Sequence, residues 1–251
     1  MCSLGYLWCE YERQSPGYSS HLCEKHRREF ELEIERLARQ IIKGVNGMKV
    51  HTCSKTNKDN PYMSIWNMNY THKDKNKDWV FVSRRESPQP VTGPVKAPDA
   101  VLIAAIIDNK LVVTKELRPP LGGYLYSLPA GTVEKGETAE EVVRRELQEE
   151  TGLVVDGIDK VSPILYSSAG FTDESIQIFF VTCHGTITNE FQEEYEDIET
   201  MLLDKDEITD LLDSKGKFEN VMIGARSWPV FAMYRMIQTM YDEEEQHDTP
   251  I

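Results

Sequence analysis

The chain has 251 residues, which is enough to bury the core of one large domain, or of one domain with an appendage. Its 42 Asp and Glu residues against 28 Lys and Arg give a formal net charge of −14, which argues against a general nucleic-acid or membrane-surface binder. The sequence shows no apolar run of about 18 residues and no signal-peptide pattern, so we expect a soluble, cytoplasmic protein without a membrane partner.

Residues 1–50 are expected to form a separate appendage, and they contain four candidate zinc ligands. Cys23 and His26 have a ligand-like spacing at the start of a predicted amphipathic helix. The full set of candidates is Cys2, Cys9, Cys23 and His26. The alternative is a set of isolated reduced thiols with a surface histidine, because the gap between Cys2 and Cys9 is longer than in a usual zinc knuckle. The helix is expected to pack on the main domain or on a partner subunit.

Residues 51–98 are expected to form the N-terminal strands. A segment rich in lysine and asparagine at 71–78 predicts a hairpin turn. Short aromatic strands flank it at Tyr62–Tyr70 and at Trp79–Arg85. Each aromatic residue taken alone is consistent with ordinary strand packing.

The pattern then changes to buried strands. Residues 99–107 are almost entirely apolar, 108–109 predict a turn, and 111–116 predict a second strand. A rigid loop, Arg118-Pro-Pro-Leu-Gly-Gly, ends that strand, and a third strand at 125–128 leads into Pro-Ala-Gly.

A capped helix with closely spaced carboxylates is predicted next. Thr138 is a plausible N-cap that starts a capping box. Glu146 and Glu150 are spaced i,i+4 and Glu149 lies beside them, so their charges repel by a few tenths of a kcal/mol per pair. A hard divalent cation, Mg²⁺ or Mn²⁺, accounts for such a cluster better than a solvated acidic helix face does.

This segment resembles the Nudix hydrolase signature. Glycine, five residues, glutamate and seven residues precede Arg-Glu-Leu-Gln-Glu-Glu-Thr-Gly-Leu. Upstream, Trp79-x4-Arg84, Lys115-Glu-Leu-Arg118-Pro-Pro and Leu128-Pro-Ala-Gly131 are similar to the ADP-ribose pyrophosphatase branch of that superfamily. Members of this branch are homodimers with swapped N-terminal strands.

The resemblance implies an α/β protein with the Nudix fold, an α/β/α sandwich around a mixed β-sheet. An N-terminal β subdomain and a helical appendage would precede it. The expected divisions are an appendage at 1–50, N-terminal strands for dimerisation and base binding at 51–98, the hydrolase domain at 99–241, and an acidic tail at 242–251. The last helix of the hydrolase domain is expected at Ser227–Tyr241.

The resemblance also implies a metal site and its partners. Glu146, Glu149 and Glu150 would hold Mg²⁺ or Mn²⁺, and the backbone carbonyl of Ala130 would be a further ligand. Arg145 would pair with one of these carboxylates and orient the site, and Glu149 and Glu150 would also take part in catalysis.

For the substrate, the resemblance implies contacts from two arginines and from aromatic rings. Arg84 and Arg118 would bind the diphosphate and the terminal ribose, close to Gly131. Trp79 would stack on the adenine from one side, and an upstream ring from the other. The candidates for that upstream ring are Tyr62 and Trp66.

A further catalytic carboxylate is expected from the acidic loop before the strand near residue 200. Glu196 is favoured there, with Glu194 or Glu193 as alternatives. In the loop before 175, Ala169 stands where this branch has a proline that is associated with ADP-ribose specificity. The exact nucleotide sugar is therefore left open.

The function implied is the hydrolysis of ADP-ribose to AMP and ribose 5-phosphate. The nearest alternative is a pyrophosphatase for a GDP-sugar, NADH or a dinucleotide. An alternative of another class is a ligand sensor or regulator that has the Nudix fold and a zinc-bearing N-terminal module. The complete set of glutamates argues against that sensor, and the acidic charge argues against a nucleic-acid partner.

Overall fold

The computed structural model describes residues 48–55, 63–86, 88, 95 and 97–247. They divide into two compact units. The smaller unit contains the described residues up to Lys55 together with Ile65–Val80, and the larger one contains Met63, Ser64 and the described residues from Phe81 onward. The four divisions expected from the sequence stay predictions.

The smaller unit is a three-stranded sheet in the order β1-β2-β3. Its strands are β1 (Met48–Lys55), β2 (Ser64–His72) and β3 (Lys75–Ser83). Lys73 and Asp74 both have positive φ, as the tight turn of a twisted hairpin requires. The predicted hairpin is therefore confirmed, whereas β1 was not anticipated from its polar sequence.

The larger unit is built around a mixed sheet that has nine strands within the described residues. Its main path runs β12-β6-β5-β4-β10-β8, with β7 on β4, β9 on β10 and β11 on β5. β10 runs parallel to β4 and β12 runs parallel to β6, while the other strand pairs of this sheet in the described residues are antiparallel. The strands are β4 (Ala100–Ile107), β5 (Lys110–Arg118), β6 (Gly123–Ser127), β7 (Ala130–Thr132), β8 (Val154–Val161), β9 (Leu165–Tyr166), β10 (Ser175–His184), β11 (Ile198–Leu203) and β12 (Met222–Ile223).

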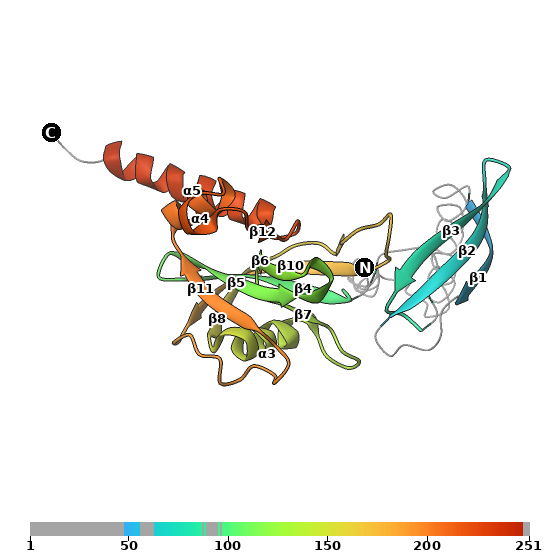
Figure 1. Cartoon of the computed structure of the whole chain (residues 1–251), viewed down its shortest axis with the longest axis horizontal. Helices are drawn as coiled ribbons and strands as arrows, with labels where there is room; N and C mark the ends of the chain where they lie inside the picture. Colours follow the sequence, from blue (N-terminus) through green and yellow to red (C-terminus); the bar gives the residue numbers. More distant parts are fainter. Residues whose placement is uncertain (1–47, 56–62, 87, 89–94, 96, 248–251) are drawn as a thin grey trace, which may run out of the picture. The chain divides into compact units, whose positions relative to one another are not determined.

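Helices cover both faces of this sheet. They are α3 (Ala139–Thr151) on one face, and α4 (Lys205–Leu212) and α5 (Trp228–His247) on the other, as Figure 1 shows. Single 3₁₀ turns lie at Pro119–Leu121 and Gly216–Phe218.

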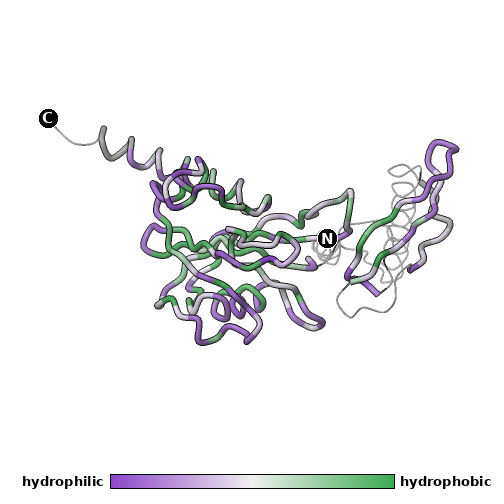
Figure 2. Tube along the Cα trace, viewed as in Figure 1, coloured by the Kyte–Doolittle hydropathy of each residue, from purple (hydrophilic) through white to green (hydrophobic). Residues whose placement is uncertain are grey.

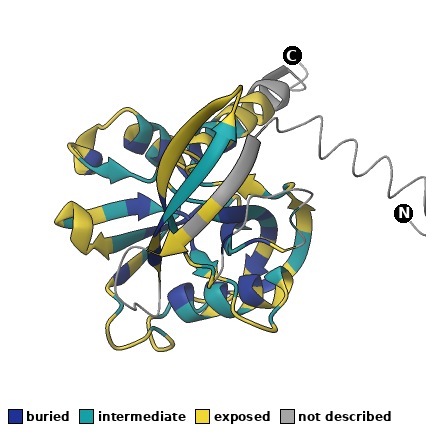
Figure 3. Ribbon diagram, turned by 90° about the vertical axis from the view of Figure 1, so that its right-hand side faces the viewer, coloured by how far each residue is buried: buried dark blue, intermediate teal, exposed yellow. Residues whose placement is uncertain are grey.

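Strand β4 explains this layering because its alternate residues face opposite ways. Val101 and Ile103 pack in an apolar cluster with Leu147 of α3. Leu102 packs in a second cluster with Phe231 of α5. The central strands are accordingly apolar (Figure 2) and buried (Figure 3). The predicted α/β/α sandwich with a mixed sheet is confirmed.

The helix α3 begins and ends as its sequence predicts. The Thr138 hydroxyl accepts a hydrogen bond from the Glu141 backbone N–H, and the Glu141 carboxylate accepts one from the Thr138 backbone N–H. Gly152 ends the helix with φ of 78°, a left-handed conformation that favours glycine. By contrast, α5 continues past the predicted end at Tyr241 to His247, since Glu and Gln are good helix formers.

None of the helices in the described part of the chain is long and apolar enough to cross a membrane.

Candidate active site

The C-terminal half of α3 presses two carboxylates against strand β7. The Ala130 backbone N–H donates a hydrogen bond to Oε2 of Glu150 at 3.3 Å. At Gly131, a Cβ atom would lie 2.1 Å from Cγ, Cδ and Oε1 of Glu146. Glycine is therefore needed at this position, because any side chain would occupy the space of the Glu146 carboxylate.

Arg145 holds the neighbouring carboxylates in place. Its Nη1 lies 2.8 Å from Oε1 of Glu146 and 2.8 Å from Oε2 of Glu149. Its Nε lies 3.1 Å from Oε1 of Glu137, on the turn before the helix. These contacts support the expected orienting role of Arg145, and they account for Glu137 as a partner of that arginine.

Because these carboxylates are removed from water, their negative charge is unfavourable unless a positive charge compensates it. Desolvation raises the pKa of Glu146 to about 7 in spite of the opposing charge of Arg145. Desolvation also raises the pKa of Glu150 well above its usual range, and the charges of Glu146, Glu116 and Glu196 add to this effect. A cation bound between these groups would relieve both the burial cost and the mutual repulsion.

The donor set fits a hard divalent cation. It consists of carboxylate oxygens, which Mg²⁺ and Mn²⁺ prefer. Among the described residues, no three acidic, histidine or cysteine side chains converge at ligand distance. The guanidinium of Arg145 lies between Glu146 and Glu149 and supplies positive charge there.

The loop that carries Glu196 is attached to the end of α3. The backbone carbonyl of Glu150 accepts hydrogen bonds from Nε2 of Gln192 at 2.9 Å and from Oγ1 of Thr200 at 3.1 Å. Gln192 Nε2 also donates to the carbonyl of Ile198 at 3.0 Å. These bonds fix both ends of the loop beside the buried glutamate.

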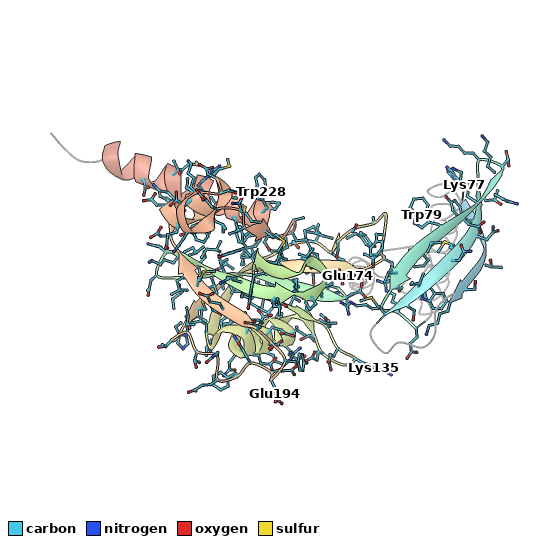
Figure 4. The ribbon with its side chains drawn as sticks, in the orientation of Figure 1. Lys77, Trp79, Lys135, Glu174, Glu194 and Trp228 are labelled. Carbon is cyan, nitrogen blue, oxygen red and sulfur yellow. The ribbon has the colours of Figure 1, made fainter. Side chains whose placement is uncertain are left out.

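Of the three loop candidates, Glu196 has the clearest connection to the carboxylates of α3. Its charge raises the pKa of Glu146 and of Glu150, which places it near both. The Glu193 carboxylate instead accepts a hydrogen bond from the Tyr195 hydroxyl. The exposed side chain of Glu194 points away from α3 (Figure 4).

Glu116 is a candidate site residue that sequence reasoning missed. It lies on β5 opposite Ile198 of β11, and its Oε2 forms an ion pair with Nη2 of Arg118 at 2.6 Å. Desolvation raises the pKa of Glu116. The positive charge of Arg118 lowers this pKa, and the negative charge of Glu196 raises it further. The signal was available in the sequence, because residues two apart on a strand share a face, and the candidate Arg118 therefore indicated Glu116.

The other predicted arginine, Arg84, lies beside the loop between β9 and β10. Its Nε lies 3.2 Å from Oε1 of Glu174, and Nη1 of Arg226 lies 3.5 Å from Oε2 of the same carboxylate. Ala169 is exposed in this loop. Within the described residues, Arg84 pairs with Glu174 and not with a predicted metal ligand, so its substrate role stays a prediction.

Two of the predicted base-binding residues, Trp66 and Trp79, belong to the smaller unit. Trp79 on β3 has 47% of its surface exposed (Figure 4), while Trp66 on β2 is 8% exposed. Trp79 is therefore the better placed of the two for stacking on a base. Tyr62 lies outside the described residues, as do the four predicted zinc ligands, Cys2, Cys9, Cys23 and His26.

Comparison with known proteins points to one family. A family model described as "NUDIX domain" matches residues 96–221. An "ADP-ribose pyrophosphatase" of Bacillus subtilis is 32% identical over 127 residues, covering 50% of this chain and 68% of that protein. An "ADP-sugar pyrophosphatase" of Mus musculus is 28% identical over 141 residues, covering 52% of this chain and 64% of that protein.

A solved structure described as "Crystal structure of ADP compounds hydrolase" has a similar fold. It superposes with a TM-score of 0.57 over 77% of this chain and 95% of that chain, at 15% sequence identity. At this identity the likeness concerns the fold alone.

Proposed function

Because the chain belongs to the Nudix family, we propose that it hydrolyses the diphosphate bond of a nucleotide sugar. The substrate proposed is ADP-ribose, and the products are AMP and ribose 5-phosphate. The names of the Bacillus and mouse relatives support this substrate class. The observation that carries the proposal is the grouping of the buried Glu150 and the partly buried Glu146, both against β7, with Glu196 from a separate loop.

Glu146, Glu149 and Glu150 would hold the divalent cations, together with the carbonyl of Ala130. Bound Mg²⁺ would screen the charge of the diphosphate and lower the pKa of an attacking water. Arg145 keeps two of these carboxylates at fixed positions through its two contacts at 2.8 Å. Because no three of the described carboxylates converge at ligand distance, the glutamate side chains would have to turn toward a bound cation.

Glu196 would accept the proton of the attacking water. A base must lie within hydrogen-bond reach of the water that it activates, which requires a carboxylate near the metal site but off the helix. The bonds from Gln192 and Thr200 to the Glu150 carbonyl, which attach the Glu196 loop to α3, support this role. Glu149, at the more exposed end of the cluster, could share this work.

Arg118 would bind the diphosphate. Its side chain is 45% exposed and lies at the end of β5, so the guanidinium can reach a ligand while the backbone stays fixed in the sheet. A guanidinium can donate two parallel hydrogen bonds to phosphate oxygens. Arg84, 39% exposed beside Glu174, would make a second contact with phosphate or ribose.

The proposal extends to the base and to the assembly. Trp79 would stack on the adenine, and the protein would be a homodimer. Size-exclusion chromatography with light scattering tests the dimer, and fluorescence quenching of Trp79 by AMP, absent in Trp79→Leu, tests the stacking.

The proposed activity is tested by incubating the purified chain with Mg²⁺ and a panel of substrates. The panel contains ADP-ribose, a GDP-sugar, NADH and a dinucleotide, and AMP or the matching nucleotide is measured by chromatography. Glu150→Gln should abolish turnover without a change in the circular dichroism spectrum. Glu140→Gln is the matched control, because it removes the same charge from an exposed position on the same helix. No turnover of any panel member would contradict the proposal.

A further inference from the structure

The ion pair between Glu116 and Arg118 lies on the face of the sheet that carries the metal-site glutamates. On β5, Val112 packs in the apolar cluster that contains Leu147 of α3, whereas Val113 packs in the opposite cluster. Side chains alternate along a strand, so Glu116 and Arg118 share the face of Val112. Both groups are therefore directed toward the side of the sheet that α3 covers.

Glu116 is also electrostatically connected to that site. Its carboxylate interacts unfavourably with the charge of Glu196 and with that of Glu150. Its side chain is 22% exposed, so water screens these interactions only in part. The partner that offsets the charge of Glu116 is Arg118, at 2.6 Å.

Arg118 cannot give its full hydrogen-bonding capacity to two anions at once. The nitrogen that pairs with Glu116 is Nη2, one of the two atoms that form the fork of a bidentate phosphate contact. When a diphosphate takes that fork, Glu116 loses its counter-charge beside Glu150 and Glu196. A cation at the metal site is then the available source of compensation.

We propose that Glu116 holds Arg118 until the diphosphate takes its place, and that the released carboxylate strengthens divalent-cation binding at the glutamates of α3. Glu116 is a positioning residue in this scheme, because it acts through Arg118 and through the charge of the site. This inference rests on the proposed function, since it assumes that Arg118 binds the diphosphate. Binding of the substrate and of the cation is then mutually reinforcing, as linkage requires.

The test measures binding and not turnover. Mn²⁺ affinity is measured by electron paramagnetic resonance with and without α,β-methylene ADP-ribose, a non-hydrolysable analogue. Analogue affinity is measured by calorimetry in EDTA and in Mn²⁺. The variant is Glu116→Gln in the full chain, and Glu116→Thr, also compatible with a strand, serves if the first variant does not fold.

Glu199→Gln provides a matched control. Glu199 lies on the neighbouring strand β11 and forms an ion pair with Lys115 of β5 at 2.7 Å. Lys115 precedes Glu116 on β5, and Glu199 is paired with Lys115 across the two strands. Because side chains alternate along a strand, Lys115 and Glu199 lie on the side of the sheet opposite to Glu116. The control removes the same charge and an ion pair from the same two strands.

In the wild type, the analogue should increase the affinity for Mn²⁺. In Glu116→Gln, the factor by which the analogue increases this affinity should be about tenfold smaller, which is within the usual range of coupling between two sites. In EDTA, Glu116→Gln should bind the analogue several-fold more tightly than the wild type, because no ion pair has to break. Glu199→Gln should match the wild type in both measurements.

The outcomes separate the two proposals. If the wild type hydrolyses ADP-ribose but Glu116→Gln keeps the full enhancement, the role of Glu116 is overturned and the proposed function stands. If the wild type neither hydrolyses the panel nor binds the analogue, the proposed function fails, and this inference fails with it.

Discussion

The close approach of Glu146 to Gly131 gives a sharp prediction, which Gly131→Ala tests. The added Cβ would lie 2.1 Å from the Glu146 side chain, and real Cβ atoms essentially never make contacts under 3.0 Å. The backbone of Gly131 is outside the left-handed region, so alanine fits it without strain. The overlap must therefore be relieved by the Glu146 carboxylate, which moves by about 1 Å or more.

The expected cost falls on activity and not on stability. A misplacement of about 1 Å at a reacting centre costs about 100-fold in rate, which corresponds to about 2.7 kcal/mol in the activation barrier. Glycine to alanine at an unstrained position stabilises by about 0.4–1 kcal/mol. An off-rotamer Glu146 costs about 0.5–1.5 kcal/mol. The two effects nearly cancel, so the melting temperature should change by only a few degrees.

The assay measures kcat/KM for ADP-ribose with Mg²⁺, together with the melting temperature by differential scanning fluorimetry. Gly157→Ala on β8 is the control, since its Cβ would meet only Oγ1 of Thr182, at 3.2 Å, away from the site glutamates. An unchanged kcat/KM in Gly131→Ala would refute the reasoning. A large loss of melting temperature that accompanies the loss of activity would also refute it, because the glycine would then be structural.

Three further predictions concern the loop, the metal and the helix cap. Glu196→Gln should lower kcat by about 100-fold or more, while Glu194→Gln, exposed on the same loop, should leave it unchanged in the same chromatographic assay. Since burial raises the pKa of Glu146 from 4.5 to about 7, its contribution to stability is full below pH 4.5 and is lost as pH rises through 7. The melting temperature in EDTA should therefore fall from pH 5 to pH 8, and Mg²⁺ should raise it more at pH 8; an equal rise at both values would contradict this. Thr138→Ala should lower the free energy of unfolding by about 1 kcal/mol in urea titrations, and no change would show that the capping box is dispensable.

Features that depend on neighbouring residues were predictable from the sequence. The capping box of α3, its glycine end and the hairpin turn at Lys73–Asp74 all follow from residues a few positions apart. The apolar run of β4 and its buried character follow from composition alone. The glutamates proposed to bind the metal were identified in the same way, because the helical period places them on one side of α3.

Features that depend on distant pairings were not predictable in the same way. The polar segment β1 is a strand because it pairs with β2, and this pairing could not be predicted from the sequence of β1 alone. The sequence could indicate that Glu116 shares a strand face with Arg118, but only the β5–β11 register sets Glu116 opposite Ile198, close to the Glu196 loop. Choosing among the three loop glutamates likewise required the contacts of that loop with α3.

The two hydrogen bonds to the Glu150 carbonyl have a consequence for protein engineering. Gln192 and Thr200 hold the same acceptor, and the Asp197 carbonyl accepts a hydrogen bond from the Leu117 backbone N–H, so the loop is attached on both sides of its exposed tip. The tip, residues 193–195, can therefore be exchanged as a cassette while Glu196 is kept. Libraries of different length and composition can be inserted there to alter substrate choice, while both attachment points and the helix beneath them remain unchanged.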